Sequence, residues 1–300
     1  MSTLVNSTIK LIDSFLVDRQ ARGLADNTIL YYARKLYQFN GYCETQSVMK
    51  INQIDSTVIR KFLLWMEYTG HNKGGVLTSY RALKAFLHWY EEETDTITAI
   101  HKVKAPRKPF EPLEGVSLDT VMQLVNVCKN NTFMDARDKA ILLGLLDTGT
   151  RAREFLSIDL PDTNLETGSA LIRKSKSGKP RTVYFGNKSR GAISLYLNHC
   201  HDTNPALWVT HYGERLSYNG LRVIIGKRSE QAGLDKQPSL HSFRRGHAIS
   251  MLRAGTDVYT LARLMGHSDI NILKHYLHLT NTDTAEAHRK FGPIDGSNYG

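Results

Sequence analysis

The segment HSFRRGHAISMLRAGTDVYTLARLMGHSDINILKHY, residues 241–276, decides how the rest of the chain is interpreted. It contains four side chains that suit chemistry on a phosphate group: His241, Arg244, His267 and Tyr276. Ser239 can cap a helix on which His241 and Arg244 share one face, where backbone amides and the helix dipole also favour an anion. The segment therefore predicts a phosphate-binding site at a helix N-terminus.

Two further helices are predicted after the one that carries His241. Gly255 and Asp257 separate it from the helix DVYTLARLM, which ends at Gly266. A third helix, beginning at Ser268 or Asp269, carries Tyr276 toward its end. The phenol is therefore expected on a different helix from the first imidazole.

A second candidate group lies upstream, beside the most apolar part of the chain. The run from Ala140 to Leu146 is apolar nearly all round, which predicts a central, buried helix. Thr148-Gly149-Thr150 ends it, and Arg151 follows at once. A guanidinium placed there needs an anion or a partner, because an unpaired charge is costly to bury.

A third group lies on a predicted hairpin. The sequence SALIRKSKSGKPRTVYF, residues 169–185, is typical of two short strands around a Ser-Gly-Lys-Pro turn. The turn region is dense in cations: Arg173, Lys174, Lys176, Lys179 and Arg181.

Together these groups meet the needs of a phosphodiester reaction. Its transition state requires fixed positive charge around the non-bridging oxygens, an in-line nucleophile and an acid for the leaving oxygen. Each residue alone also has a structural explanation, as a salt-bridged Arg, a capping His, a core Tyr or a surface Lys. The combination favours chemistry on a phosphate.

The first part of the chain predicts a small helical unit. Apolar periodicity places helices near residues 9–23, 27–43, 55–70 and 77–93. Several bases lie on or beside these helices, where a solvated face and contacts to a nucleic-acid backbone are equally plausible interpretations: Arg34, Lys35, Lys73, Arg81 and Lys84.

Residues 95–112 are predicted to be a basic, extended linker. The stretch contains Pro106, Pro109 and Pro112, and it ends the helical periodicity. Among its bases are three that could track a nucleic-acid backbone: Lys104, Arg107 and Lys108.

The overall charge indicates a polyanionic partner. The chain of 300 residues carries a formal net charge of +10, and Lys and Arg exceed Asp and Glu both before and after Phe110. With 41% hydrophobic residues it can bury a core. No apolar run approaches a membrane span, and the N-terminus has no secretory pattern.

Neither a disulfide framework nor a metal is expected. Cys43, Cys128 and Cys200 lie far apart without CxxC spacing, which favours a reduced, cytoplasmic protein. The C-terminal histidines lack the HExxH or carboxylate spacing of a metal site: His241, His247, His267, His275 and His278. The sequence therefore predicts no metal and no cofactor.

Five ordered motifs give the chain a family resemblance. TGTRAREFLSI, the hairpin lysines, HSFRRGHA, LMGHSDI and the tyrosine after them resemble the tyrosine recombinase (phage integrase) family, including the Xer recombinases. Residues near 8–95 also resemble the helical, SAM-like core-binding domain of that family. The resemblance covers nearly the whole chain.

The resemblance implies a role for each motif residue. Arg151 and Arg244 resemble the two arginines that clamp the scissile phosphate, and Tyr276 resembles the nucleophile that forms a 3′-phosphotyrosyl link. His241 would be the acid/base beside the phosphate, and His267 a second donor. Covalent catalysis of this kind retains the bond energy, so neither ATP nor a metal is implied.

Further residues follow from the same resemblance. Glu154 matches an acidic position that could orient the active-site cations, and Lys176 matches the general acid for the leaving 5′-oxygen. Lys174 remains a rival, because a slip of two residues in a hairpin keeps the same face. Two departures stand out: Arg245 replaces a usual His, and the SGKP tip replaces a glycine-rich one. The remaining cations of this part are expected DNA contacts: Lys174, Lys179, Arg181 and Arg245.

The predicted fold class is mainly α with a small β-hairpin or sheet (α+β) in the catalytic domain. The expected parts are a helical core-binding domain, a linker, a catalytic domain and a C-terminal tail that could be exchanged between protomers: residues 1–94, 95–112, 113–280 and 281–300. By resemblance the two domains would close as a C-shaped clamp round DNA.

The implied partner is duplex DNA with inverted-repeat recombination sites. The resemblance further implies a homotetramer that synapses two sites and exchanges strands through a Holliday junction. Alternatives are a type IB topoisomerase-like nicking-closing enzyme and a non-catalytic, sequence-specific DNA-binding protein. The role that the resemblance implies is DNA integration or excision, or the resolution of dimers.

Overall fold

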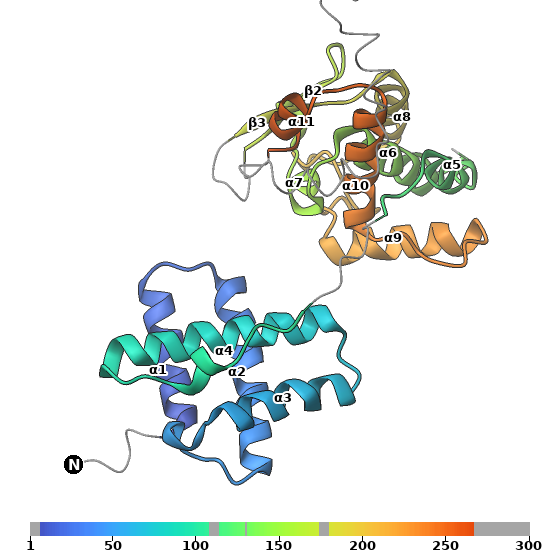
Figure 1. Ribbon diagram of the computed structural model, residues 1–300. Helices are drawn as coiled ribbons and strands as arrows, with labels where there is room; N and C mark the ends of the chain where they lie inside the picture. Colours follow the sequence, from blue (N-terminus) through green and yellow to red (C-terminus); the bar gives the residue numbers. More distant parts are fainter. Residues whose placement is uncertain (1–6, 108–113, 130, 174–179, 267–300) are drawn as a thin grey trace, which may run out of the picture. The chain divides into compact units, whose positions relative to one another are not determined.

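The computed structural model describes residues 7–107, 114–129, 131–173 and 180–266. The chain divides into two compact units, residues 1–111 and 112–300 (Figure 1). Within the described residues, no helix is both long and apolar enough to cross a membrane.

The N-terminal unit is a bundle of helices, as its apolar periodicity predicts. The four are α1 (Thr8–Ala21), α2 (Asp26–Thr45), α3 (Ser56–Tyr68) and α4 (Lys73–Thr94). α4 packs against each of the other three (Figure 1). Asp55 caps α3, because its Oδ1 accepts hydrogen bonds from the amides of Thr57 and Val58 at 2.8 and 2.7 Å. Four fully buried phenylalanines fill the core: Phe15, Phe39, Phe62 and Phe86.

The start of the predicted linker belongs to this unit. Residues 95–97 are exposed, but the chain then packs on the helical core, because the 3-10 helix η2 (Ala99–Lys102) and the residue that follows it bury Ile100 and Val103. The hydroxyl of Tyr80 donates to the carbonyl of Val103 at 2.8 Å. The expectation of a linker from residue 95 is therefore wrong for its first half, since two apolar side chains in a basic stretch supply the anchor.

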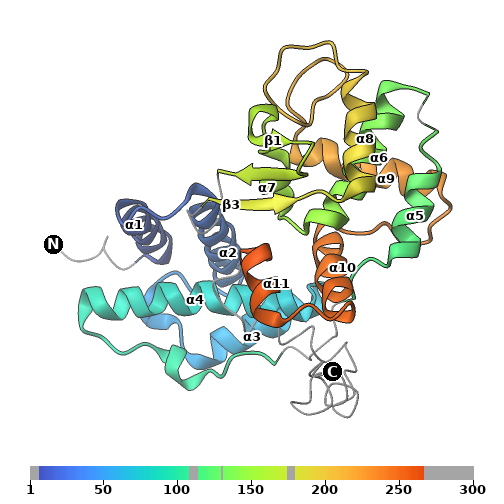
Figure 2. The ribbon, with the colours of Figure 1, turned by 90° about the horizontal axis from the view of Figure 1, so that it is seen from above.

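The C-terminal unit is also mainly helical. Its helices are α5 (Leu118–Asn126), α6 (Phe133–Thr148), α7 (Ala152–Leu156), α8 (Asn187–Leu197), α9 (Tyr218–Gln231), α10 (Leu240–Arg253) and α11 (Val258–Met265). α6 lies at the centre and packs against α5, α8 and α10 (Figure 2). Ile141, Leu142 and Leu145 are buried, as the apolar run predicts. Ser239 caps α10, as predicted, and Ser117 caps α5 in the same way.

A small antiparallel sheet completes this unit. The strands β1 (Thr163–Asn164), β2 (Ser169–Ile172) and β3 (Arg181–Tyr184) lie in that order. Ile172 pairs with Arg181, and Ser169 pairs with Tyr184. The predicted hairpin is confirmed and has a third, edge strand; its tip, residues 174–179, lies outside the described residues. The fold class of a mainly helical protein with a small sheet is therefore confirmed.

Candidate active site

Arg151 follows a turn that only glycine fits well. α6 ends at Thr148, and Gly149 adopts the left-handed conformation with φ 56°. A Cβ atom at Gly149 would lie 2.3 Å from Cδ2 of His247, so the backbone and the imidazole are in close contact. The turn sends the chain into the short helix α7, with Arg151 as its N-cap residue.

Glu154 holds Arg151 and Arg181 together. Its Oε1 accepts from Nη1 of Arg151 at 2.8 Å, and its Oε2 accepts from Nη2 of Arg181 at 2.7 Å. The Arg151 amide also donates to Oε2, at 3.1 Å. Burial alone would raise the pKa of Glu154, but the hydrogen bond and charge of Arg181, followed by Arg151, lower this pKa to about 2. The carboxylate therefore stays ionised between two guanidinium groups, which supports the orienting role expected for it.

Arg181, one of the expected DNA contacts, is mostly buried. Its side chain is only 12% exposed and is paired with Glu154. Its Nε also donates to the carbonyl of Leu264 at 3.3 Å, at the end of α11. Arg181 therefore ties β3 to α7 and α11.

Arg244 is buried at the centre of the site. Only 6% of the residue is exposed. Nη1 donates to the carbonyl of Gly149 at 2.7 Å, and Nη2 donates to the carbonyl of Met265 at 2.8 Å. One guanidinium on α10 thus bridges the turn before Arg151 and the end of α11.

His241 and Arg245 lie on the same helix as Arg244. His241 is solvent-exposed. The surrounding protein nevertheless removes part of the water around its imidazole. This desolvation, followed by the positive charges of Arg245, Arg244 and Arg151, lowers the pKa of His241. Arg245 is half-buried, and its Nε donates to the carbonyl of Glu114 at 2.9 Å. The structure therefore brings Arg151, Arg244 and His241 into one electropositive site.

The remaining candidates of this unit are Lys174, Lys176, Lys179, His267 and Tyr276, which lie outside the described residues. Met265 and Gly266, which lead directly to His267, are held in place: Arg244 bonds the Met265 carbonyl, and the Arg181 side chain packs against Gly266. The Ile172–Arg181 pair likewise fixes the base of the hairpin loop that contains the lysines.

One residue of the site was missed as a contributor. His247 is 7% exposed, and its Nδ1 lies 3.0 Å from the carbonyl of Leu146. Its ring packs against Gly149, the residue whose carbonyl binds Arg244. Its spacing of three residues from Arg244 was a signal that both share one helix face.

The predicted DNA contacts of the N-terminal unit are surface residues. Lys35 is half-buried and Lys108 lies outside the described residues; the others are exposed: Arg34, Lys73, Arg81, Lys84, Lys104 and Arg107. Tyr31 links the two helices that carry most of them, because its hydroxyl on α2 donates to the Thr78 carbonyl on α4 at 2.7 Å. Arg34 and Lys35 line a hollow beside Tyr31.

Comparison with known protein families identifies the class to which the chain belongs. Residues 116–283 match the phage integrase family, and residues 12–94 match the SAM-like N-terminal domain of phage integrases. The chain belongs to the phage integrase family and is a tyrosine recombinase, a site-specific enzyme that cuts and rejoins DNA.

Individual relatives agree with this assignment. The chain is 26% identical to the tyrosine recombinase XerD of Oceanobacillus iheyensis over 291 residues, which cover 94% of this chain and 97% of XerD. Its fold is similar to that of a fragment of the Tn1549 transposon integrase in complex with a circular intermediate DNA, with a TM-score of 0.79 at 15% identity, covering 95% of this chain and 99% of the solved fragment.

Two further solved structures share the fold. The XerH site-specific recombinase bound to palindromic difH substrate has a TM-score of 0.73 at 19% identity, covering 90% of this chain and 82% of XerH. The lambda integrase tetramer bound to a Holliday junction has a TM-score of 0.73 at 13% identity, covering 88% of this chain and 78% of that integrase.

Proposed function

We propose that this recombinase cleaves each DNA strand by forming a 3′-phosphotyrosyl link to Tyr276. The observation that carries the proposal is the anchoring of two guanidinium groups around Gly149. Arg244 is bonded to the Gly149 carbonyl, and Arg151, two positions further on, is held by Glu154. Two fixed cations at one site suit the non-bridging oxygens of a scissile phosphate, because preorganised charge stabilises the transition state without reorganisation.

In the first step the phenol oxygen of Tyr276 attacks the phosphorus, and the bond from phosphorus to the 5′-oxygen breaks. The phenol proton passes to His241, whose lowered pKa keeps the imidazole neutral and able to accept it. The phosphotyrosyl ester retains the energy of the broken bond. A 5′-hydroxyl from another strand then attacks this ester and forms the new phosphodiester bond as the bond from phosphorus to the Tyr276 oxygen breaks. The phenoxide takes its proton back from His241, and the attacking hydroxyl gives its proton to the group that protonated the first leaving oxygen.

The leaving 5′-oxygen needs a proton, and we assign its donation to Lys176. The placement of the loop is supported by its two ends, Ile172 and Arg181, which are paired across the sheet. His267 is assigned as a second donor to the phosphate, since it directly follows the held Gly266. Lys174 stays the alternative general acid, as it lies on the same predicted strand face as Lys176.

The proposed substrate is duplex DNA with inverted-repeat sites, which both units of the protein bind as a clamp. The exposed bases of the N-terminal unit and the described linker residues Lys104 and Arg107 supply phosphate contacts, with Lys179 and Arg245 from the C-terminal unit. XerH is bound to its difH substrate and lambda integrase forms a tetramer on a Holliday junction. By extension, four copies of this chain exchange strands in two steps, and residues 281–300 pass between neighbours.

A suicide substrate with a nick near the cleavage point tests the nucleophile. The wild-type protein is expected to accumulate a covalent adduct on DNA, and Tyr276→Phe is expected to bind the same DNA without forming it. Tyr259→Phe is the matched control, because Tyr259 is a 72% exposed tyrosine of α11. Adducts formed by Tyr276→Phe at the wild-type rate would refute the assignment.

The general acid is tested with a 5′-thio leaving group, which needs no proton. Lys176→Ala should lose cleavage of ordinary DNA and regain it on the thio substrate. The same pattern in Lys174→Ala, with normal cleavage by Lys176→Ala, would move the role to Lys174. Relaxation of supercoiled DNA that lacks any recombination site, without strand exchange between sites, would favour a topoisomerase-like activity.

A further inference from the structure

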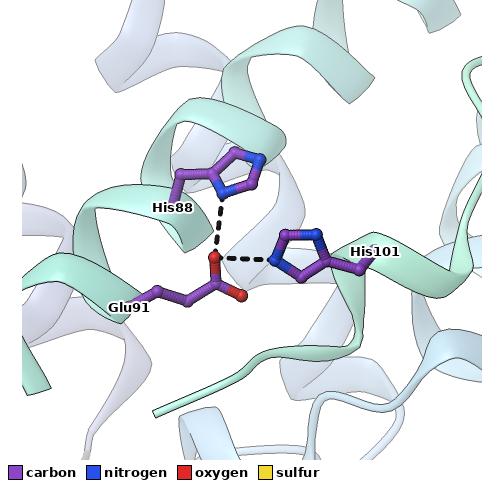
Figure 3. A group of neighbouring side chains, drawn as sticks. All are labelled: His88, Glu91 and His101. Atoms are coloured by element: carbon purple, nitrogen blue, oxygen red, sulfur yellow. Dashed lines mark hydrogen bonds and ion pairs between the residues drawn. The ribbon is translucent and has the colours of Figure 1, made fainter. Parts of the chain in front are cut away.

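A cluster of metal-ligand side chains lies in the N-terminal unit and includes none of the candidate active-site residues. His88 and Glu91 are one turn apart on α4, and His101 lies on η2 (Figure 3). One ligand atom from each residue lies within 4.8 Å of the other two. We propose that these three side chains bind a divalent transition-metal ion, with zinc as the best match.

The geometry of the carboxylate supports this site. Nδ1 of His88 and Nε2 of His101 lie 2.8 and 2.9 Å from the same atom, Oε2 of Glu91 (Figure 3). The other oxygen, Oε1, accepts from the amide and the hydroxyl of Thr98, both at 2.7 Å. Thr98 therefore fixes the carboxylate so that only Oε2 faces the two imidazoles. Residues that hydrogen-bond a metal ligand commonly orient it in this way.

The donor set is one that zinc accepts. Two imidazole nitrogens and one carboxylate oxygen form a three-ligand site in which a fourth position is left to water or another group. The two rings lie 4.9 Å apart at 72°, so their nitrogens approach Oε2 from different directions. In a tetrahedral site the ligand atoms are about 3.4 Å apart, at metal–ligand distances of about 2.1 Å. To admit the ion, each nitrogen must move away from Oε2 by about half an ångström, and the two nitrogens, which lie within 4.8 Å of each other, must take up the same spacing.

Access and partial burial are also suitable. The Glu91 side chain is 15% exposed, whereas those of His88 and His101 are 35% and 53% exposed. An ion can therefore enter from solvent and keep a water ligand while the carboxylate is shielded. The site was not predictable from the sequence, because His101 comes close to His88 and Glu91 on α4 only through the packing of Ile100 and Val103.

Bound metal would fasten η2 to α4. η2 lies at the end of the helical unit, just before the part of the chain that leads to the second unit. The proposed ion thus stabilises the 95–103 segment against α4 and needs no contact with the active site. This inference stands whether or not the assignment of Tyr276 holds.

The test uses the full chain, without a histidine tag and stripped of metal by a chelator. Zn²⁺ is titrated against a competing indicator, and Co²⁺ is used as a spectroscopic probe of coordination. The wild type is expected to bind one ion whose affinity falls at least about tenfold in His88→Ala and in His101→Gln. Thr98→Val, which keeps all three ligands, should weaken binding less. His71→Ala is the control, because His71 bonds Gln38 in the same unit and is not in the cluster.

Amide hydrogen exchange locates the bound ion. Zinc should slow the exchange of residues 95–103 in the wild type and in His71→Ala, and should leave their exchange unchanged in His101→Gln. His101 is exposed, so its replacement tests the site even if His88→Ala fails to fold. Equal zinc affinity in the wild type and in the His88→Ala/His101→Gln double variant overturns the proposal, as does zinc protection confined to other segments.

Discussion

Nη2 of Arg181 lies 2.7 Å from Oε2 of Glu154, and this ion pair joins the hairpin to the helix that begins after Arg151. The two residues are far apart in the sequence but meet at the centre of the site. Glu154 is 3% exposed, and its other oxygen binds Arg151. The carboxylate therefore balances two cations that would otherwise repel each other in a partly buried place.

Glu154→Ala removes this balance and should destabilise the C-terminal unit. Breaking a buried ion pair by removing one partner costs about 3–5 kcal/mol, because the other charge is left unpaired. We expect a loss near the lower figure, since Arg151 is 27% exposed and remains partly hydrated. Urea unfolding of the full chain, with amide exchange of peptides from the C-terminal unit, measures the change.

Asp162→Ala is the matched control for this prediction. Asp162 accepts from Nε of Arg173 at 2.6 Å, but the Arg173 side chain is 67% exposed and stays hydrated when the pair is broken. The control should lose much less stability than Glu154→Ala. Equal losses would contradict the special position of Glu154.

The lowered pKa of Glu154 should make the stability of the folded protein depend on pH. The pKa of Glu154 is lowered from 4.5 to about 2 in the folded protein, so its contribution to the free energy of unfolding is complete above pH 4.5. This contribution is lost progressively as the pH falls from 4.5 toward 2. The stability difference between the wild type and Glu154→Gln should therefore shrink over that interval, as measured by urea unfolding at a series of pH values. A difference that stays constant below pH 4.5 would contradict the ion-pair account.

Gly149→Ala should disturb the active site through the backbone. An alanine there must adopt a φ of 56°, which costs about 1–2 kcal/mol, and its Cβ would lie 2.3 Å from the His247 ring. The turn must shift, and the Gly149 carbonyl that binds Arg244 must shift with it. We expect lower stability and a cleavage rate reduced at least about tenfold, measured as adduct formation on a suicide substrate.

Gly233→Ala is a control that separates the effect of backbone strain from the effect of a steric clash with a neighbouring side chain. Gly233 has a φ of 66°, and a Cβ atom there would meet nothing within 4 Å. It should lose a similar amount of stability from the backbone while cleaving DNA at the normal rate. If Gly233→Ala impairs cleavage as much as Gly149→Ala does, the link from Gly149 to Arg244 is not the cause.

Local signals in the sequence predicted much of this fold. Ser239 caps α10 where the sequence predicts a helix start, because a cap depends on residues only two or three positions away. The hairpin follows for the same reason, since its strands adjoin one turn. These features are decided within short segments.

Long-range pairing was not predictable in the same way. Arg181 lies in a run of cations whose composition suggests a solvent-facing side chain. Only the folded sheet brings its guanidinium beside Glu154. Likewise, residues 95–103 have the composition of a linker, but two apolar side chains dock them on the helical unit. In both places the composition of the segment favoured solvent, while tertiary packing supplied a buried partner.

The exposed bases of the N-terminal unit lead to a prediction about salt. Arg34 lies on α2 and Arg81 on α4, and Tyr31 joins these helices through its bond to Thr78. If both arginines contact phosphates, each one bound to DNA displaces about one counterion. Arg34→Ala and Arg81→Ala should then each lower the slope of log affinity against log salt by about 1, and weaken binding to specific and unrelated DNA alike.

Fluorescence anisotropy with a labelled duplex, measured over a series of salt concentrations, tests this prediction. Arg22→Ala serves as the control, because Arg22 is an exposed arginine of the same unit whose Nε is bonded to Asp18 at 3.0 Å. It should leave the slope unchanged. An unchanged slope in Arg34→Ala and Arg81→Ala would mean that these bases only solvate the helical surface. A loss restricted to one DNA sequence would instead assign them to base edges, since phosphate contacts carry no direct sequence information.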